Sequence, residues 1–169
     1  MSKIILGMDL SLNLPAFAVV EVTDERKIRI LEVCHVDNKK QTKWTQAQKL
    51  EATAKQLRCL IHKYKQFDAV VRERGFSRFA QTTQALFRVV GVSDLIAYEE
   101  LAYKQIEEIP PTAIKSLIGG YGKATKEEVE DGLRQYLVAE QKDFKFVTDD
   151  ESDAVAVTVT YAYKKGWLK

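Results

Sequence analysis

The chain has 169 residues, enough for one domain with one sizeable core, and its 46% hydrophobic and 30% charged residues are typical of a soluble globular protein. No apolar run approaches the ~18 residues that a membrane helix needs. The N-terminal sequence also lacks the longer apolar region of a signal peptide, so we expect no membrane association and a cytoplasmic location. The formal net charge of +2 is unevenly spread, because residues 39–88 carry 12 basic and only 3 acidic side chains. This basic segment indicates a surface that binds a polyanion, although a solvated lysine-rich helix face has the same composition.

The first half of the chain predicts four strands and two helices. Three short apolar runs over 3–10, 15–22 and 28–36 are joined by tight connections, which favours an antiparallel meander. Apolar residues at helical spacing predict a helix over 45–66, and the short run 68–72 predicts a buried strand. A second helix is expected over 79–97, interrupted by Gly91.

The second half predicts one more strand and three helices. A fifth strand is expected over 103–109 and a short helix over 112–118. Thr125 and Glu128 form a capping-box pattern for a helix expected to reach residue 138. The last helix is expected to begin near 149 or 150, although alternation over 155–163 also fits a strand. The order of elements predicts a single α/β domain over 1–169, with a five-stranded mixed sheet and helices on both faces.

Four carboxylates are placed unusually for structural residues. Asp9 and Glu73 each stand at the end of an apolar strand, and Asp150 and Asp153 share one side of the first turn of the last helix. Each position has an ordinary explanation by itself. Asp9 fits a turn or cap, Glu73 fits a salt bridge with its flanking arginines, and the aspartate pair stabilises a helix dipole.

Taken together, the four carboxylates predict a metal site if they converge at one end of the sheet. Mg²⁺ prefers oxygen ligands, and it commonly binds a few carboxylates together with water and substrate phosphate. Two such ions activate a water and stabilise the leaving oxygen in phosphodiester hydrolysis. A nearby basic surface would hold the phosphate backbone. The pattern therefore favours a metal-dependent nuclease with two Mg²⁺ ions per site, with Mn²⁺ as the alternative metal.

Four segments in series resemble the RuvC family of Holliday junction resolvases. They are KIILGMDLSLNLPAFAVVEV, DAVVRERGF, IKSLIGGYGKATKEEV and DESDAVAVTVTYAY. No single segment is specific, but they occur in the family's order and at similar spacing over nearly the whole chain. The resemblance implies an RNase H-like fold and an endonuclease that resolves four-way junctions or related branched DNA. It also implies metal ligation by the four carboxylates and functional roles for Lys115 and Lys126.

The resemblance further implies a homodimer that cuts two opposed strands. The helix over 78–97 is the candidate interface, and its possible contacts are Ala85, Leu86, Val89, Val90 and Leu95. Phe76 matches a family aromatic residue that stacks or wedges at the branch point, but a loop anchor in the core is an equal alternative. Leu10 and Ser11 replace the Pro-Gly of the family, and Tyr161 replaces its closing histidine. These departures lead us to expect a bacteriophage-encoded member, and they leave open any link to the branch-migration proteins RuvA and RuvB.

The basic middle segment supplies the candidates for DNA contact, which are Lys39, Lys40, Lys43, Arg72, Arg74, Phe76 and Arg78. Two rival functions compete with a nuclease. The stretch GMDLSLN resembles the first phosphate loop of actin-like phosphotransferases, but these enzymes need two lobes around the nucleotide. A branched-DNA binder without catalysis is the other, because fold alone does not determine function.

Overall fold

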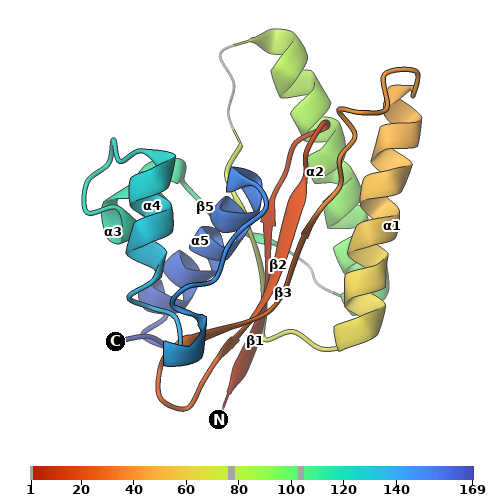
Figure 1. The fold of residues 1–169 in the computed structure, drawn as a ribbon. Helices are drawn as coiled ribbons and strands as arrows, with labels where there is room; N and C mark the ends of the chain where they lie inside the picture. The colour runs from red at the N-terminus through yellow and green to blue at the C-terminus, as the bar shows by residue number, and fades with distance from the viewer. Residues whose placement is uncertain (1, 76–78, 103–104) are drawn as a thin grey trace.

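A five-stranded mixed sheet lies at the centre of the protein, seen here in a computed structural model that describes residues 2–75, 79–102 and 105–169 (Figure 1). The strands are β1 (Lys3–Asp9), β2 (Ala16–Val22), β3 (Ile28–His35), β4 (Ala69–Glu73) and β5 (Glu107–Ile109). Their order is β3-β2-β1-β4-β5. The β1–β2 and β2–β3 pairs are antiparallel, whereas β1–β4 and β4–β5 are parallel. The expected mixed α/β sheet is therefore confirmed.

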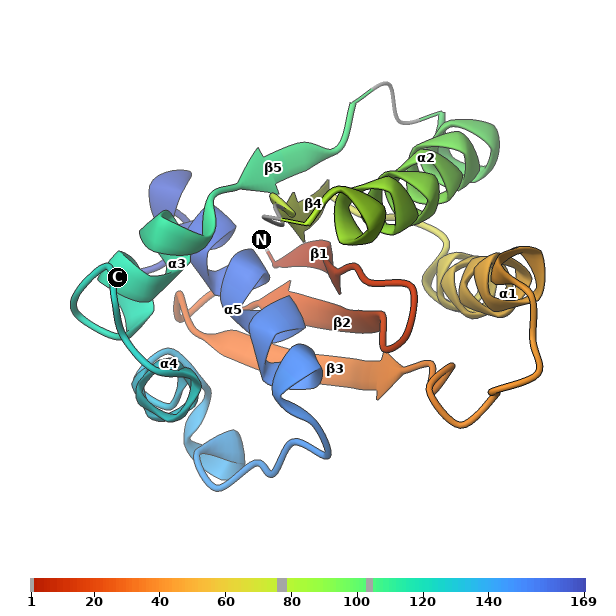
Figure 2. The same ribbon diagram turned by 90° about the horizontal axis from the view of Figure 1, so that it is seen from above.

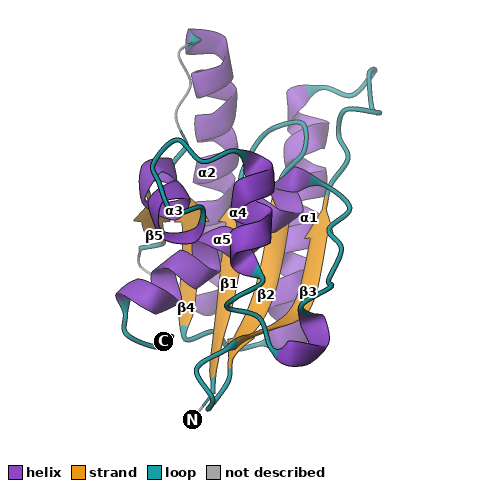
Figure 3. Cartoon of the chain, turned by 60° about the vertical axis from the view of Figure 1, so that its left-hand side comes forward, coloured by secondary structure: helices purple, strands orange, loops and turns teal. Residues whose placement is uncertain are grey.

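Helices cover both faces of this sheet (Figures 2 and 3). The helices are α1 (Gln46–Tyr64), α2 (Ala80–Leu101), α3 (Pro111–Ile118), α4 (Lys126–Leu133) and α5 (Asp149–Lys164). One face packs on α1 and α2, and the other packs on α5, with α3 and α4 beside it. None of the helices in the described part of the chain is long and apolar enough to cross a membrane.

Alternation along the central strands divides the core into two halves. In β1, Leu6 and Met8 are buried towards α1 and α2, whereas Ile5 is buried in the cluster that contains α5. In β4, Val70 is buried towards α1 and α2, and Val71 is buried in the cluster that contains α5. Because both strands are covered on both faces, they read as near-continuous apolar runs, which is typical of the central strands of an α/β sheet.

The structure corrects three of the expected boundaries. The helix expected to reach residue 138 ends at Leu133, because Leu137 bridges to Ile28 at the start of β3. Gly91 does not interrupt α2, which continues to Leu101. The fifth strand is only Glu107–Ile109, and residues 103–104 lie outside the described residues. The segment 155–163, for which strand and helix were both open, belongs to α5.

Candidate active site

Asp9 and Glu73 are neighbours at one edge of the sheet. Each is the last residue of its strand, and the parallel register pairs Met8 with Arg72, one residue earlier. The carboxyl ends of parallel strands meet at the same edge. Alternation from Ile5 in β1 and Val71 in β4 directs both carboxylates towards the α5 side. The expected convergence of these two strand ends is therefore present in the structure.

The first turn of α5 brings the other two carboxylates to the same place. Thr148 caps this helix by accepting a hydrogen bond from the Glu151 backbone N–H at 3.3 Å. The helix then lies directly over β1, where a side chain at Gly7 would overlap Thr158 and the carbonyl oxygen of Ala154. Glycine at position 7 thus permits the close helix–strand contact that places Asp153 near Asp9. The sequence signal for this was a lone glycine within an apolar strand.

Burial and like charge raise the pKa values of three of these carboxyls. The pKa of Asp9 lies well above its ordinary value because the group is buried and faces Glu73, Asp153 and Asp150. Burial and Asp153 raise the pKa of Glu73 to about 7. Burial also raises the pKa of Asp153, with further contributions from Asp150 and Asp149. Such a cluster is destabilised by its own charge, and a bound cation would relieve that repulsion.

Two lysines lie beside the carboxylates. The Lys126 Nζ atom lies 3.2 Å from Asp153 Oδ2 and 3.8 Å from Asp149 Oδ2. Burial alone would lower the pKa of Lys126, but the aspartates around it raise that pKa above its ordinary value. The positive charges of Lys126 and Lys115 both oppose the rise in the pKa of Glu73. The structure therefore brings both predicted lysines to the site, one from α4 and one from α3.

The chemical type of the donor atoms at this site suits a hard divalent cation. All four side chains offer carboxylate oxygens, the ligands that Mg²⁺ and Mn²⁺ prefer. Within the described ranges, however, no group of three or more acidic, histidine or cysteine side chains is arranged to hold a metal ion. A hollow of about 470 Å³ opens beside Asp9 and Glu73, and Gln81, Thr82 and Pro111 also line it. The site thus combines acidic oxygen donors with a space that is open to a substrate.

Arg72 lies in the interior rather than on the surface, where a DNA contact was expected. The residue is 6% exposed, and its guanidinium donates hydrogen bonds to Ser93 and Asp94 of α2 and to Glu108 of β5. Buried arginines of this kind hold elements together through bidentate contacts. Alternation explains the placement, because Arg72 precedes Glu73 and so points to the opposite face of the sheet. We therefore assign Arg72 to the packing of β4, β5 and α2, in place of the expected contact with DNA.

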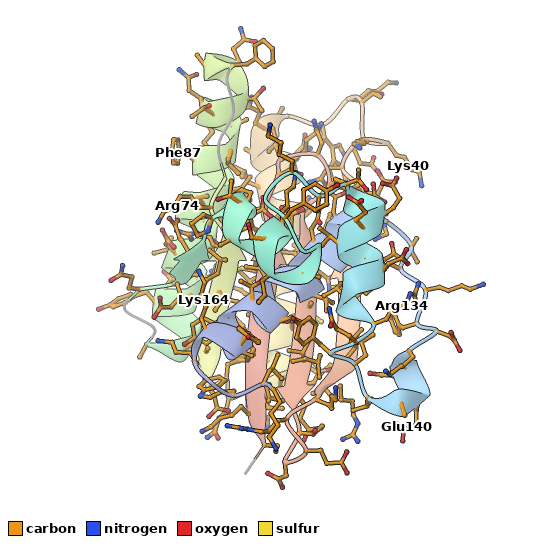
Figure 4. The ribbon with its side chains drawn as sticks, turned by 90° about the vertical axis from the view of Figure 1, so that its left-hand side faces the viewer. Lys40, Arg74, Phe87, Arg134, Glu140 and Lys164 are labelled. Carbon is orange, nitrogen blue, oxygen red and sulfur yellow. The ribbon has the colours of Figure 1, made fainter. Side chains whose placement is uncertain are left out.

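The other candidates for DNA contact are exposed or lie outside the described residues. Lys39, Lys40 and Lys43 are exposed between β3 and α1, and Lys40 pairs with Asp37 at 2.9 Å. Arg74 is exposed directly after Glu73. In Figure 4, Arg74 and Lys40 lie on opposite sides of α3 and α4. Phe76 and Arg78 fall outside the described residues.

Sequence reasoning missed two buried polar residues next to the site. Asn38 is fully buried, and its Nδ2 atom donates to the carbonyl oxygen of Leu12 at 2.9 Å, in the loop that follows Asp9. Glu151 is 4% exposed and accepts a hydrogen bond from Val147 at 2.8 Å. The partners of both residues depend on how distant segments meet, so no local pattern identified them.

Comparison with known proteins gives consistent results over nearly the full chain. The family model described as crossover junction endodeoxyribonuclease RuvC matches residues 5–161. A relative of that description from Prochlorococcus marinus (strain MIT 9312) is 31% identical over 165 residues, covering 96% of this chain and 98% of the relative. Another, from Dictyoglomus thermophilum, is 26% identical and covers 96% of this chain and 98% of its own length. These relatives are bacterial, so the expected bacteriophage origin gains no support.

Solved structures show the same fold at low sequence identity. The structure of T. thermophilus RuvC in complex with Holliday junction substrate aligns with a TM-score of 0.81 at 21% identity, over 96% of this chain and 94% of that one. The yeast mitochondrial Holliday junction resolvase aligns with a TM-score of 0.67 at 15% identity, over 96% and 79% of the two chains. The expected RNase H-like, RuvC-type fold is thus confirmed.

Proposed function

Because this chain belongs to the RuvC family of crossover junction endodeoxyribonucleases, we propose that it resolves Holliday junctions or related branched DNA by paired, metal-dependent hydrolysis in a homodimer. The observation that carries the proposal is the meeting of Asp9 and Glu73 with the start of α5. The family match and the one-sheet core favour a nuclease over a two-lobed phosphotransferase. We propose that residues 1–169 work as a single nuclease domain in the cytoplasm.

Asp9, Glu73, Asp150 and Asp153 are the proposed ligands of two Mg²⁺ ions, with Mn²⁺ as a substitute. When bound, these ions supply an activated water and stabilise the leaving oxygen of the phosphodiester. Asp9 and Glu73, which line the hollow, would hold the ions together with Asp150 and Asp153. Lys126 is proposed to neutralise the negative charge that the scissile phosphate adds, because its Nζ atom already contacts Asp153. Lys115 is proposed to add positive charge near Glu73, because its charge also opposes the rise in the pKa of that carboxyl.

The basic residues around this edge are proposed to hold the DNA backbone. One proposed group of contacts comprises Lys39, Lys40 and Lys43, and Arg74 is a separate contact. We also propose DNA contacts for Phe76 and Arg78, which lie outside the described residues. Positive side chains bind phosphates without reading sequence, which suits an enzyme that recognises the shape of a junction.

The homodimer is proposed to form through the outer face of α2. Phe87, Leu95 and Tyr98 share this face and are 61%, 55% and 64% exposed. Gly91 lies among them with open space around it, so a second helix is able to approach closely. Phe87 projects from the outer side of α2 (Figure 4). Of the residues expected at the interface, Leu95 is available, whereas Val89 is fully buried against the chain's own core. An apolar face of this kind is self-complementary around a two-fold axis.

Cleavage of synthetic DNA tests the proposal directly. A four-way junction, a three-way junction and a linear duplex are incubated with the protein, with Mg²⁺ or with EDTA. We expect paired cuts in a branched substrate with Mg²⁺ only, leaving 5′-phosphate and 3′-hydroxyl ends. A Phe87→Glu variant is expected to become monomeric by light scattering and to lose paired cutting, because the charge would be buried in the α2 interface.

Asp68→Asn is the matched control, because Asp68 lies next to the opposite end of β4 and pairs with Lys3 at 3.0 Å. It should cut as the unchanged protein does, whereas Asp9→Asn should not. Tight junction binding without cutting, in both Mg²⁺ and Mn²⁺, would contradict the proposal and favour a non-catalytic branched-DNA binder.

A further inference from the structure

His35, the last residue of β3, contacts the first turn of α5. Its Nδ1 atom lies 2.8 Å from Glu151 Oε1. The other carboxylate oxygen of Glu151 accepts the backbone N–H of Val147 at 2.8 Å, just before the helix begins. The Glu151 carboxylate is therefore engaged on both oxygens, between the end of a strand and the start of a helix.

Burial makes this contact costly to lose. The side chain of Glu151 is only 5% exposed and that of His35 is 22% exposed. A buried carboxylate without hydrogen-bond partners is strongly unfavourable, so the helix turn has little freedom to rotate away from His35 and Val147. Within the described residues, His62 and Glu100 form a chemically equal pair at 2.9 Å, but the side chain of His62 is 66% exposed and the pair lies between α1 and α2, away from the carboxylates.

Helix geometry connects Glu151 to the proposed metal ligands. Successive residues of an α-helix are rotated by about 100°, so Asp150 and Asp153 point to other sides of the turn than Glu151. Holding Glu151 towards β3 therefore sets the direction in which the two aspartates project. The pair does not touch Asp150 or Asp153, and it acts on them through the helix backbone.

The same strand end is also fixed to the loop that follows Asp9. Asn38, three residues after His35, donates its backbone N–H to Asn13 at 3.0 Å and its side-chain amide to Leu12 at 2.9 Å and to Lys49 at 3.2 Å. Lys39 and Lys40 follow immediately and are exposed. Residues 35–40 thus contact the loop after Asp9 and the helix of Asp150 and Asp153, and they carry two of the proposed DNA contacts.

We propose that His35 and Glu151 are positioning residues that hold the first turn of α5 against β3, so that Asp150 and Asp153 face Asp9 and Glu73. The same contact fixes where these aspartates lie relative to Lys39 and Lys40. This rests on the proposed function, because it deepens the same site. Outer groups that orient ligands typically change metal affinity by ten- to a hundred-fold. The His35–Glu151 pair acts one step further out, so we expect on the order of ten-fold weaker metal binding when it is lost.

Mn²⁺ binding to the protein without DNA, measured by calorimetry, tests the positioning role independently of cleavage. His35→Ala, Glu151→Ala and the double variant are compared with the unchanged chain at a temperature where circular dichroism shows all of them folded. Each single variant should weaken Mn²⁺ binding by about ten-fold. The double variant should be no worse than Glu151→Ala, because that change already removes the contact with His35 together with the one from Val147. Glu151→Gln should bind nearly as the unchanged chain does, since its amide still offers an acceptor to Val147 and a donor to the ring.

His62→Ala and Glu100→Ala are the matched controls and should leave Mn²⁺ binding unchanged. If Glu151→Ala does not fold, His35→Ala carries the test, since it leaves α5 intact. Folded His35→Ala protein with unchanged Mn²⁺ affinity overturns the positioning role, as do additive losses in the double variant. If the expected losses in Mn²⁺ binding occur but no branched DNA is cut, the proposed function fails and the positioning role stands. Absence of Mn²⁺ binding to the unchanged chain overturns both.

Discussion

Arg72 and Glu73 are consecutive residues of β4, and they show two different ways of burying charge. Arg72 points towards α2 and is matched by Asp94 and Glu108, with a further hydrogen bond to Ser93. Glu73 points towards α5 and faces further carboxylates, and among the described residues the charges of Lys126 and Lys115 oppose them. The first environment satisfies its charge within the chain, whereas the second leaves negative charge in excess.

The difference separates a structural ion-pair network from the proposed active site. A matched network is complete without any further molecule, and its removal weakens the fold. A cluster of like charges destabilises the fold by itself, so its presence indicates that something else balances it. The comparison makes opposite predictions for neighbouring residues, which are tested by substitution.

The largest effect is expected for cleavage when the unmatched carboxylates are neutralised. Asp9→Asn or Glu73→Gln should lower the junction cleavage rate by about 10³-fold, equivalent to about 4 kcal/mol of transition-state stabilisation. The same variants should keep or gain thermal stability, because they remove charge repulsion. Single-turnover cleavage and thermal unfolding of the same preparations provide the two measurements. Full activity in either variant would remove that residue from the site.

The matched network should behave in the opposite way. Arg72→Met should lower the free energy of unfolding by about 3 kcal/mol, because Asp94 loses its buried cation and Glu108 keeps only its contact with Arg74 at 3.4 Å. Urea unfolding measures this, with Arg58→Met as the control, since Arg58 pairs with Glu99 and Glu100 at the surface and should contribute less than about 1 kcal/mol. A larger loss in junction binding than in stability would return Arg72 to the DNA-contact residues.

The dependence of stability on pH distinguishes the two environments further. The pKa of Glu73 is about 7 in the folded chain against 4.5 for the ordinary group, so the folded state binds more protons between these values. Stability in EDTA should therefore fall as pH rises from about 4.5 through 7, by about 2 kcal/mol from this group after allowing for partial exposure. Glu73→Gln should flatten that fall in urea unfolding at pH 5, 6, 7 and 8. A rise in stability over this range would show that Glu73 is already matched.

Lys126 belongs to the unmatched region and should affect catalysis more than the fold. Lys126→Met should lower the cleavage rate at saturating DNA by about ten-fold, since the charge that opposes Asp153 and the bound phosphate is lost. Lys164→Met, at the other end of α5, is the control and should cut normally (Figure 4). Equal rates for the two variants would remove Lys126 from the reaction.

The smallest effect is expected from the exposed cations around the carboxylates. Replacing Lys39 and Arg74 with alanine should reduce the slope of log affinity against log salt by about two, if each contacts one phosphate. Lys55 and Lys63 of α1 provide the control pair, because they are paired with Glu51 and Glu32 at 2.9 and 2.7 Å, closer than the 3.4 Å contact of Arg74 with Glu108. Junction affinity at several salt concentrations measures both. An unchanged slope in the first variant would place the DNA elsewhere.

Short-range patterns predicted most of the fold and the position of the carboxylates. Alternation and strand ends placed Asp9 and Glu73 at the edge of the sheet, and the i, i+3 spacing placed Asp150 and Asp153 on one helix turn. The same alternation predicts that Arg72 points away from Glu73, towards α2. Its positive charge was instead grouped with that of Arg74 and Arg78, and this grouping led to the expected DNA contact. The end of α4 was mispredicted because the bridge between Leu137 and Ile28 depends on a partner far away in the chain. The His35–Glu151 contact was missed for the same reason, since it joins residues 116 positions apart.

The close contact at Gly7 has a consequence for the order in which the protein is made. Asp9 is synthesised well before α5, the helix that Gly7 allows to lie close to β1. Contacts between such distant residues form late, after long-range loop closure. A nascent or prematurely terminated chain that lacks α5 therefore carries its first strands without the aspartates that complete the carboxylate cluster. Assembly of the carboxylate cluster is in this way delayed until α5 has been synthesised.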